Sequence, residues 1–464
     1  METTTTTTTL PKQIDYHLRS TLAPRYKMMK VPLNNLPSAS ATIGATSSVT
    51  LEWKLPVQTY NLSRSYISWN ENIQAQGAAN YTHTFEDVFD LGNAVTFGAA
   101  GGNDLVNLQY AQNYTKIARK IHTDLDDFLS NDDMSGLYKS NSLASANIIP
   151  GGYDKVTGVK YPSTENYIDV KQLQTSAINT AVNRYRQYPL SAFTGTLLGV
   201  DRDFWSPVEQ YLRVQAGTGD KMAFIATSAA VPATGAASIT VGNITVNSIY
   251  LYLCVEQNLE IIHNIQSAYA AGKLTYSIPY TQGFKTVGSA NGQQTNISIL
   301  LSQQYGKRLK RILHTVWNPQ EKWNTAYDCA NYDGEKIVSY QTFMDSMPIQ
   351  DRIISCLRPA GLQINSDDWL ENKKFLEKRS VYNSKEMYAI NWFHIDQFFE
   401  PHDKEGSLPD VNIDEGIPMT TSKNWLFSGQ VNADVSAANL IHYTFAEFSR
   451  EIIITNMGPV WVMA

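Results

Sequence analysis

Apolar and polar residues alternate along several short stretches of the chain, as they do in strands that bury one face. Val49, Leu51 and Trp53 share one side of such a stretch, and Ser65–Trp69 repeats the pattern. The segment Ile249–Val255 is almost continuously apolar or aromatic, which predicts a buried strand. Further strands are predicted at 95–98, 238–246, 274–278, 297–301, 387–392 and 452–454.

Three other segments carry apolar residues at spacings of three and four, which is the period of a helix. The first spans about 104–129, with Asn103 as its predicted N-cap. The second spans 258–271 and ends before Gly272. The third, 367–379, begins with acidic residues and ends with basic ones, an order that the helix dipole favours.

The order of these elements predicts two β-rich blocks joined by the second helix. A chain of 464 residues is also longer than a single domain usually is. We therefore predict a mainly β fold of two consecutive eight-stranded jelly-roll sandwiches with a few inserted helices. The division is a flexible N-terminal arm at 1–24, which contains seven threonines in a row, a first jelly roll at 25–257, a connecting helix at 258–272 and a second jelly roll at 273–464.

Charge is scarce and evenly spread. Only 17% of the residues are charged, against roughly 25% in ordinary globular proteins. The net charge is −6, and Tyr is frequent, with 26 copies. One basic run, formed by Lys307, Arg308, Lys310 and Arg311, could contact phosphate groups, but we interpret it as a solvated strand or helix face. We therefore expect no strong direct binding of nucleic acid.

The cysteines and the N-terminus indicate the compartment. Cys254, Cys329 and Cys356 are odd in number and lack CxxC spacing, which argues against a disulfide scaffold and a structural zinc site. The chain shows no signal-peptide pattern and no apolar run of 18 residues, so we expect a soluble protein that is intracellular at synthesis. The N-x-S/T sequons carry no weight in that setting; they begin at Asn61, Asn80, Asn113, Asn243 and Asn296.

Two segments resemble metal sites. His394, Asp396 and His402, with Glu400 and Asp403 nearby, include ligand types that zinc and transition metals use. Because His394 and Asp396 are two residues apart, we favour a strand with ordinary alternation that runs into a polar loop. The loop 410–416 starts like a calcium loop but has Glu415 where an EF-hand needs glycine, so only a weaker calcium site stays open there.

Other acidic groups and the known catalytic motifs give no active site. The acidic group near the end of the first helix is interpreted as a solvated or intersubunit patch; it consists of Asp124, Asp126, Asp127, Asp132 and Asp133. Asp201 and Asp203 are interpreted as part of a loop. The chain has no GxSxG, P-loop or GxGxxG motif. We predict no catalytic residue, no cofactor, no metal ligand and no enzymatic activity.

Three stretches give the chain a resemblance to a known family. They are 239–246 followed by 249–256, then Tyr340–Asp351, and finally Phe445–Val462. Together with the order of elements, they resemble the double jelly-roll major capsid proteins of tailless icosahedral DNA viruses, a group that includes virophages, polinton-like viruses and giant viruses. The resemblance covers most of residues 25–464 and supplies no catalytic residue.

The resemblance implies a structural viral protein. Three copies would form a pseudo-hexagonal capsomer, and capsomers would tile an icosahedral shell together with penton and minor capsid proteins. The protein would be made and assembled in the cytoplasm or nucleus of the host and reside in the capsid of the virion. Scarce charge and frequent Tyr suit such self-association, because interfaces are rich in Tyr and poor in Lys and Glu.

Two other classes of protein remain open at this stage. A carbohydrate-binding or receptor-binding β-sandwich, such as a spike or a lectin, would present exposed Trp side chains at a glycan site. A β-sandwich glycoside hydrolase would need two facing carboxylates about 5–9.5 Å apart. The first is the main alternative to a capsid protein.

Overall fold

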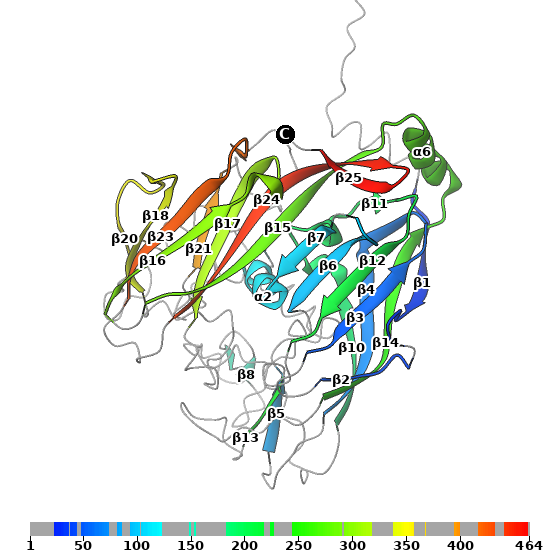
Figure 1. Ribbon diagram of the computed structural model, residues 1–464. Helices are drawn as coiled ribbons and strands as arrows, with labels where there is room; N and C mark the ends of the chain where they lie inside the picture. The colour runs from blue at the N-terminus through cyan, green and yellow to red at the C-terminus, as the bar shows by residue number, and fades with distance from the viewer. Residues whose placement is uncertain are drawn as a thin grey trace, which may run out of the picture.

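In the computed structural model, strands account for most of the described residues (Figure 1). The structure describes residues 23–36, 38–43, 48–73, 81–85, 93–102, 104–122, 148–149, 153–154, 182–217, 223–226, 244–289, 292–317, 337–356, 367, 394–399, 416–431 and 440–462. All strand pairs are antiparallel. The main fold consists of four sheets that form two sandwiches.

The first sandwich comes from the N-terminal half of the chain. One of its sheets has the order β1 (Tyr26–Pro32), β14 (Ile244–Glu256), β4 (Tyr60–Ile73) and β10 (Val182–Pro189), with β2 (Ala41–Ile43) and β11 (Asp203–Phe204) attached. The other has the order β3 (Thr50–Leu55), β12 (Gln210–Gln215), β6 (Ala94–Ala99) and β7 (Asp104–Gln109).

The second sandwich comes from the C-terminal half. One sheet has the order β15 (Thr275–Val287), β24 (Ile441–Thr455), β17 (Arg308–Trp317) and β21 (His394–Phe398), with β22 (Ile417–Pro418) and β25 (Gly458–Val462) attached. The other has the order β16 (Gln294–Leu301), β23 (Lys423–Val431), β18 (Ile337–Met344) and β19 (Met347–Pro348), with β20 (Ile354–Ser355) attached.

Both sandwiches are connected in the same way. If the eight strands along the main paths of each half are numbered in chain order, one sheet reads 1-8-3-6 and the other reads 2-7-4-5 in both halves. This pairing of first with last strand and second with seventh is the wiring of a jelly roll built from two Greek keys. The predicted fold class, two consecutive eight-stranded jelly rolls, is confirmed.

Short elements complete the described fold. Two small sheets pair β5 (Tyr81–Phe85) with β13 (Ala223–Ala226) and β8 (Ile148–Ile149) with β9 (Tyr153–Asp154). The α-helices are α2 (Ala111–His122) and α6 (Leu259–Ala270). The 3₁₀ turns are η2 (Leu190–Ala192), η3 (Leu197–Gly199) and η4 (Gln303–Tyr305).

The facing sheets of each sandwich bury the alternate residues that the sequence pattern picks out. On β3, Leu51, Trp53 and Leu55 are buried, and on β16 every second residue from Thr295 to Leu301 is buried. The largest buried side chains include Trp53 and Trp69 in the first jelly roll and Trp425 in the second. Burial of such large aromatic side chains contributes strongly to the hydrophobic stabilisation of each sandwich.

The first predicted helix is wrong over its first turns. Residues 104–109 form strand β7, which pairs with β6, and the chain turns at Tyr110, whose φ is 56°, before α2 begins at Ala111. Leu105 and Leu108 have the spacing of a helical stripe, but in the structure they are buried, together with Val106, as residues of a strand. A short apolar run satisfies both periods, so sheet pairing decides. Residues 103 and 123–129 lie outside the described residues.

The second predicted helix is confirmed. Asn258 caps α6 by accepting a hydrogen bond from the backbone of Glu260, and Gly272 has the positive φ of a helix terminus. The strands predicted at 238–246 and 249–255 are wrong as a pair: the described part is one strand, β14, with an irregular register near Ser248. Residues 1–22, 238–243, 368–379 and 387–392 lie outside the described residues.

Candidate functional site

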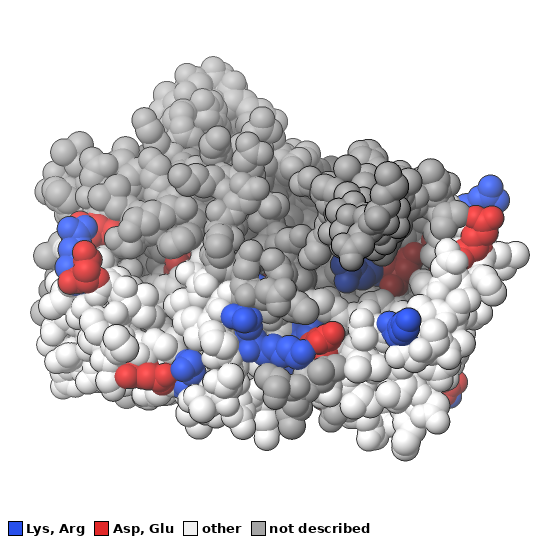
Figure 2. Space-filling view, turned by 90° about the horizontal axis from the view of Figure 1, so that it is seen from above, with Lys and Arg blue, Asp and Glu red and all other residues white. Residues whose placement is uncertain are grey.

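The surface of the described residues carries few clustered charges. Figure 2, which looks down on the side where Figure 1 shows α6 and β25, displays a mostly uncharged surface with small, separate groups of Lys, Arg, Asp and Glu. Among the described residues, several Lys, Arg, Asp and Glu side chains form ion pairs, including Lys54 with Glu209 at 2.7 Å and Lys423 with Asp345 at 3.1 Å. The charges on this face therefore lie in small groups and form no single large patch among the described residues.

The two jelly rolls are in direct contact. The sheet β15-β24-β17-β21 of the second jelly roll lies beside α2 and β7 of the first (Figure 1). Tyr114 on α2 packs on Phe445 with ring centroids 5.3 Å apart, and Tyr110 packs on Tyr443 at 5.5 Å. As a result, β24 is buried on both faces from His442 to Arg450.

Two glycines leave room for close contacts where the two jelly rolls meet. A Cβ at Gly283 on β15 would collide with the carbonyl oxygen of Gln109 on β7. Gly195, which has a φ of +65°, leaves no room beside Tyr114, and its carbonyl accepts a hydrogen bond of 2.7 Å from Thr281. The close backbone contact at Gly283 and the hydrogen bond to the carbonyl of Gly195 favour one fixed arrangement of the two jelly rolls.

A buried ion pair lies on the face of the second jelly roll that meets the first. Nε and Nη2 of Arg311 on β17 donate to the two carboxylate oxygens of Asp396 on β21 at 2.6 and 2.7 Å. Both side chains are almost fully buried, and the guanidinium also lies over the ring of Phe398. Burial alone would lower the pKa of Arg311, but the charge and hydrogen bonds of Asp396 raise it overall, so the guanidinium stays charged.

This ion pair corrects two predictions. The basic run is not a solvated face, since Lys310 and Arg311 are buried and Lys307 pairs with Glu451 at 2.6 Å. Asp396 is not the polar side of an amphipathic strand, because Ile395, Asp396 and Gln397 are all buried. The sequence pattern gave the wrong prediction because β17 is an interior strand whose outer face is covered by the other jelly roll. Alternation of polar and apolar residues along one strand does not show whether its outer face is covered by a distant part of the chain.

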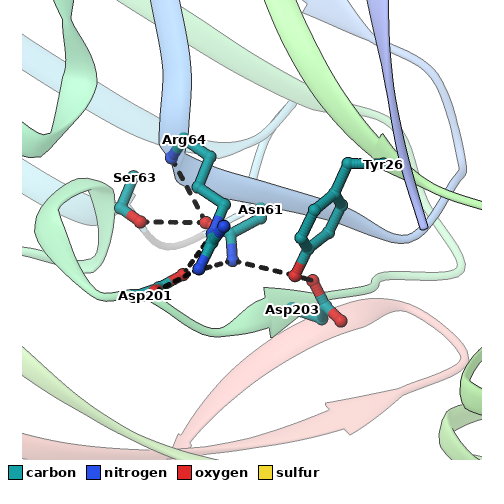
Figure 3. Close-up of polar contacts among 6 residues, drawn as sticks. All are labelled: Tyr26, Asn61, Ser63, Arg64, Asp201 and Asp203. Carbon is teal, nitrogen blue, oxygen red and sulfur yellow. Dashed lines mark hydrogen bonds and ion pairs between the residues drawn. The ribbon is translucent and has the colours of Figure 1, made fainter. Parts of the chain in front are cut away.

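A polar cluster in the first jelly roll connects β1, β4 and the segment that enters β11 (Figure 3). Arg64 on β4 donates two hydrogen bonds of 2.8 Å to the carboxylate of Asp201, and Asn61 donates another at 2.8 Å. Tyr26 on β1 donates to Asp203 at 3.0 Å. The prediction that both aspartates belong to a loop is wrong for Asp203, which lies in β11 and pairs with β4.

The ionisable groups of this polar cluster respond differently to their surroundings. Burial raises the pKa of Asp203 to about 6, whereas the hydrogen bonds from Arg64 lower the pKa of Asp201. Burial also raises the pKa of the neighbouring Cys254 thiol to about 11. A thiol with a raised pKa is less reactive, and both Cys254 and Cys356 are buried. Cys329 lies outside the described residues.

Glu256 fastens the chain where it enters the first sheet. One of its carboxylate oxygens accepts backbone hydrogen bonds from Arg25, Gln257 and Asn258 at 2.7 to 2.9 Å. The side chain of Asn258 in turn donates to the carbonyl of Ala23 at 3.0 Å. The Glu256 carboxylate therefore holds both the residue before the first strand and the beginning of α6 in place.

No family model and no curated protein sequence matches the chain. Solved structures do match along nearly its whole length. A chain in the cryo-EM structure of the Sputnik virophage has 12% identity and a TM-score of 0.55, covering 95% of this chain and 88% of that one. A chain of the PBCV-1 virus capsid has 9% identity and a TM-score of 0.54 (95% and 97% covered), and the Faustovirus major capsid protein has 9% and 0.52 (93% and 91% covered).

The chain has the double jelly-roll fold of viral capsid proteins. The wiring of both sandwiches and the match over more than nine-tenths of the chain lead to this conclusion independently. Identities near 10% explain why no sequence comparison finds the relationship.

Within the double jelly-roll fold, the described residues include no group of three or more His, Cys, Asp or Glu side chains that could hold a metal ion. His394 begins β21, while Glu400, His402, Asp403 and the loop 410–415 lie outside the described residues, as do Asp124 to Asp133. The described part of the chain also has no helix long and apolar enough to cross a membrane.

Two other histidines lie inside the second jelly roll, although sequence reasoning did not single them out. His314 and His442 are completely buried, with ring nitrogens 3.2 Å apart, and a second nitrogen of His314 is 2.8 Å from the hydroxyl of Thr444. Burial lowers the pKa of His442 to about 3 and also lowers that of His314, so both are neutral at pH 7. We interpret them as core residues, because they pack on Phe427 between the two sheets.

Two of the sequon asparagines are inaccessible in the double jelly-roll fold. Asn61 is 1% exposed and Asn113 is 4% exposed, so neither can carry a glycan in the folded protein. Asn296 is exposed on β16, and Asn80 and Asn243 lie outside the described residues.

Proposed function

We propose that the protein is a major capsid protein whose copies assemble into the shell of an icosahedral virus, with three chains per pseudo-hexagonal capsomer. The observation that carries this proposal is the repetition of one jelly roll within a single chain, with the two copies held against each other by the Gly283 and Gly195 contacts. Two similar lobes in each chain give six similar lobes in a trimer. Such a unit can tile a surface with local hexagonal order.

The comparisons support the same function over the main alternative. The PBCV-1 and Faustovirus structures are named as a virus capsid and a major capsid protein, and they share this arrangement over 93% or more of the chain. A spike or lectin would need an exposed aromatic binding site, whereas among the Trp side chains whose burial the structure describes, Trp461 is half-buried and the others are buried, namely Trp53, Trp69, Trp205 and Trp425. The similar solved structures are capsid proteins, which supports a structural role for this chain over a catalytic one.

The remaining parts of the proposal concern partners and location. The protein resides in the virion capsid, beside penton and minor capsid proteins, after assembly in the cytoplasm or nucleus of the host. Direct binding to nucleic acid is weak, and the burial of Lys310 and Arg311 supports this because it withdraws half of the basic run from solvent. The units of folding are the regions 25–257 and 273–464, joined by 258–272, with an arm at 1–24.

Light scattering combined with negative-stain microscopy tests the proposed function. The purified protein should have a mass of about three times 51.9 kDa, or larger, and should form particles with six lobes. A chain that stays monomeric at micromolar concentration, or that saturably binds a glycan array without forming oligomers, would overturn the proposal.

A further inference from the structure

The core of the second jelly roll holds a pair of ionisable side chains that the proposed function does not use. His314 on β17 and His442 on β24 are both 0% exposed. Across the sandwich, the His314 ring packs on Trp425 and Phe427 of β23, with ring centroids 5.2 and 4.6 Å apart. The pair therefore lies in the contact between the two sheets of this jelly roll.

The hydrogen bonds of the pair suit two neutral rings. Nδ1 of His314 lies 2.8 Å from the hydroxyl of Thr444, and its Nε2 lies 3.2 Å from Nδ1 of His442. Nε2 of His442 is buried with no hydrogen-bond partner among the described residues, and a Cβ at Gly288 would collide with it. A first added proton would leave a positive charge in the core, and a second would place two positive charges side by side.

The strands packed around the pair present neutral side chains to it. These side chains are Thr286, Ile395, Trp425, Phe427 and Thr444. Tyr340 on β18 stacks on Phe427 and is uncharged throughout the acid range. The backbone of His394 on β21 pairs with Thr315 and not with either buried histidine.

The charged residues of the same strands do not face the pair. Those in the middle of the strands lie on the outer face that meets the first jelly roll; they are Lys285, Arg311, Asp396 and Glu447. Others lie four or more residues along β17 and β24 from the pair; they are Arg308, Lys310, Arg450 and Glu451. Lys423, at the start of β23, pairs with Asp345 at 3.1 Å. No described carboxylate is therefore placed to offset a proton on the pair.

We propose that the His314–His442 pair makes the second jelly roll open on acidification, at a pH at which the first jelly roll stays closed. Burial lowers the pKa of His442 to about 3 and also lowers the pKa of His314, whereas each has a pKa of about 6.5 in the unfolded chain. The unfolded chain therefore binds more protons than the folded one below pH 6.5. Stability is lost from there down to about pH 3, where the folded rings begin to titrate.

The first jelly roll lacks this acid sensitivity. Among the side chains whose burial the structure describes, it buries no histidine. Its Asp203, whose pKa burial raises to about 6, acts in the opposite direction, because the folded state holds that proton more tightly.

A window of pH separates the histidines from the carboxyl groups. The pKa values of Glu52 and Asp201 in the first jelly roll and of Asp345 in the second are lowered, mainly by hydrogen bonds to each carboxylate. Because unfolded carboxyl groups titrate near pH 4, these residues reduce stability only below about pH 4.5. The interval from pH 7 to pH 5 therefore reports the histidines.

Hydrogen exchange on the wild-type protein tests the proposal in this interval. From pH 7 to pH 5, the equilibrium constant for opening should rise about 25-fold for each histidine, or about 600-fold for the pair. Protection factors, which correct for the pH dependence of exchange itself, should fall accordingly on β17, β23 and β24 and change little on β3, β6 and β12. An equal fall in both jelly rolls, or no fall in the second, would overturn the proposal.

Substitution of the histidines assigns the effect to the pair. His314→Gln and His442→Asn should each reduce the change with pH to about 25-fold, and the double variant should remove it, even if all three are less stable at pH 7. The matched control is His263→Gln on the exposed side of α6, which should keep the full change. A double variant that keeps the full change would refute the assignment, and the wild-type comparison decides if a variant does not fold. None of these results bears on self-assembly, so the capsid function is tested separately.

Discussion

The third strand of each jelly roll carries an arginine that binds an aspartate through two hydrogen bonds. Arg64 on β4 binds Asp201 at 2.8 Å, and Arg311 on β17 binds Asp396 at 2.6 and 2.7 Å. The geometry is nearly the same, but the first pair is about half exposed, with side-chain exposures of 49% and 58%, and the second has 3% and 0%. The difference in burial, rather than the hydrogen bonds, should decide how much stability depends on each pair.

The largest effect is expected at the buried pair. Removing one partner leaves the other charge buried between the jelly rolls without an opposite charge beside it, which costs about 3–5 kcal/mol of stability. Arg311→Ala and Asp396→Ala should therefore each lower the free energy of unfolding by that amount in urea titrations. Replacing both residues together with Met and Leu should cost less than either single change, because no isolated charge remains. A loss below about 1 kcal/mol for Arg311→Ala would show that water reaches the site.

The next effect concerns the contact that buries this pair. Gly283→Ala places a methyl group against the carbonyl oxygen of Gln109, and overpacking of this kind costs about 1–3 kcal/mol. We expect the variant to unfold at lower temperature and to be cut faster by protease between the jelly rolls. Gly272→Ala is the control: nothing lies within 4 Å of the added Cβ, so only the strain of its positive φ, about 1–2 kcal/mol, should lower its stability. A loss for Gly283→Ala that is smaller than the loss for Gly272→Ala would contradict a close backbone contact.

A smaller effect should depend on pH at the polar cluster of the first jelly roll. Burial raises the pKa of Asp203 to about 6, above its value in the unfolded chain, so the folded protein holds this proton more tightly. The stability from this group is present below about pH 4 and is lost as pH rises through 6. Asp203→Asn should therefore be more stable than the wild type at pH 8, with the gain fading towards pH 4. Melting temperatures measured across this range on both proteins check it, and a gain that grows towards acid would refute it.

The smallest effect is expected at the exposed pair itself. Arg64→Ala should cost about 0.2–1 kcal/mol, and added salt should reduce the difference further, because water and ions screen half-exposed charges. Urea titrations at low and high salt, run beside Arg311→Ala, measure the contrast directly. Comparable losses for the two variants would remove burial as the explanation.

The strands that could be predicted were those whose pattern is set by their own sandwich. Leu51 and Trp53 alternate with polar residues because one face of β3 meets the opposing sheet and the other meets solvent. On β24 the second face meets the other jelly roll, so both sets of residues are buried and alternation disappears. Leu105 and Leu108 fit either a helix or a strand, and only the pairing of β7 with β6 decides between them.

The polar sites were harder to predict because their partners are distant in the chain. Arg311 and Asp396 are 85 residues apart, and Arg64 and Asp201 are 137 apart. A basic run and two flanking aspartates look like surface features until the sheets bring their partners together. Sequence patterns report local periodicity, whereas these pairs follow from the jelly-roll wiring that sets β17 beside β21 and β11 beside β4.

The anchor at Glu256 has a mechanical consequence. Strand β1 begins at Tyr26 opposite Glu256, the last residue of β14, so the chain ahead of β1 and the start of α6 leave the sheet at the same end. Force that pulls these two segments apart would break the hydrogen bonds between β1 and β14 one after another, starting at this end. Strands resist such sequential separation less than they resist sliding along each other. The Glu256 carboxylate accepts hydrogen bonds from the backbone N–H groups of Arg25 and Asn258 at the end where separation of the strands would begin. Force applied to the N-terminal residues must therefore break these hydrogen bonds before the hydrogen bonds between β1 and β14 can break.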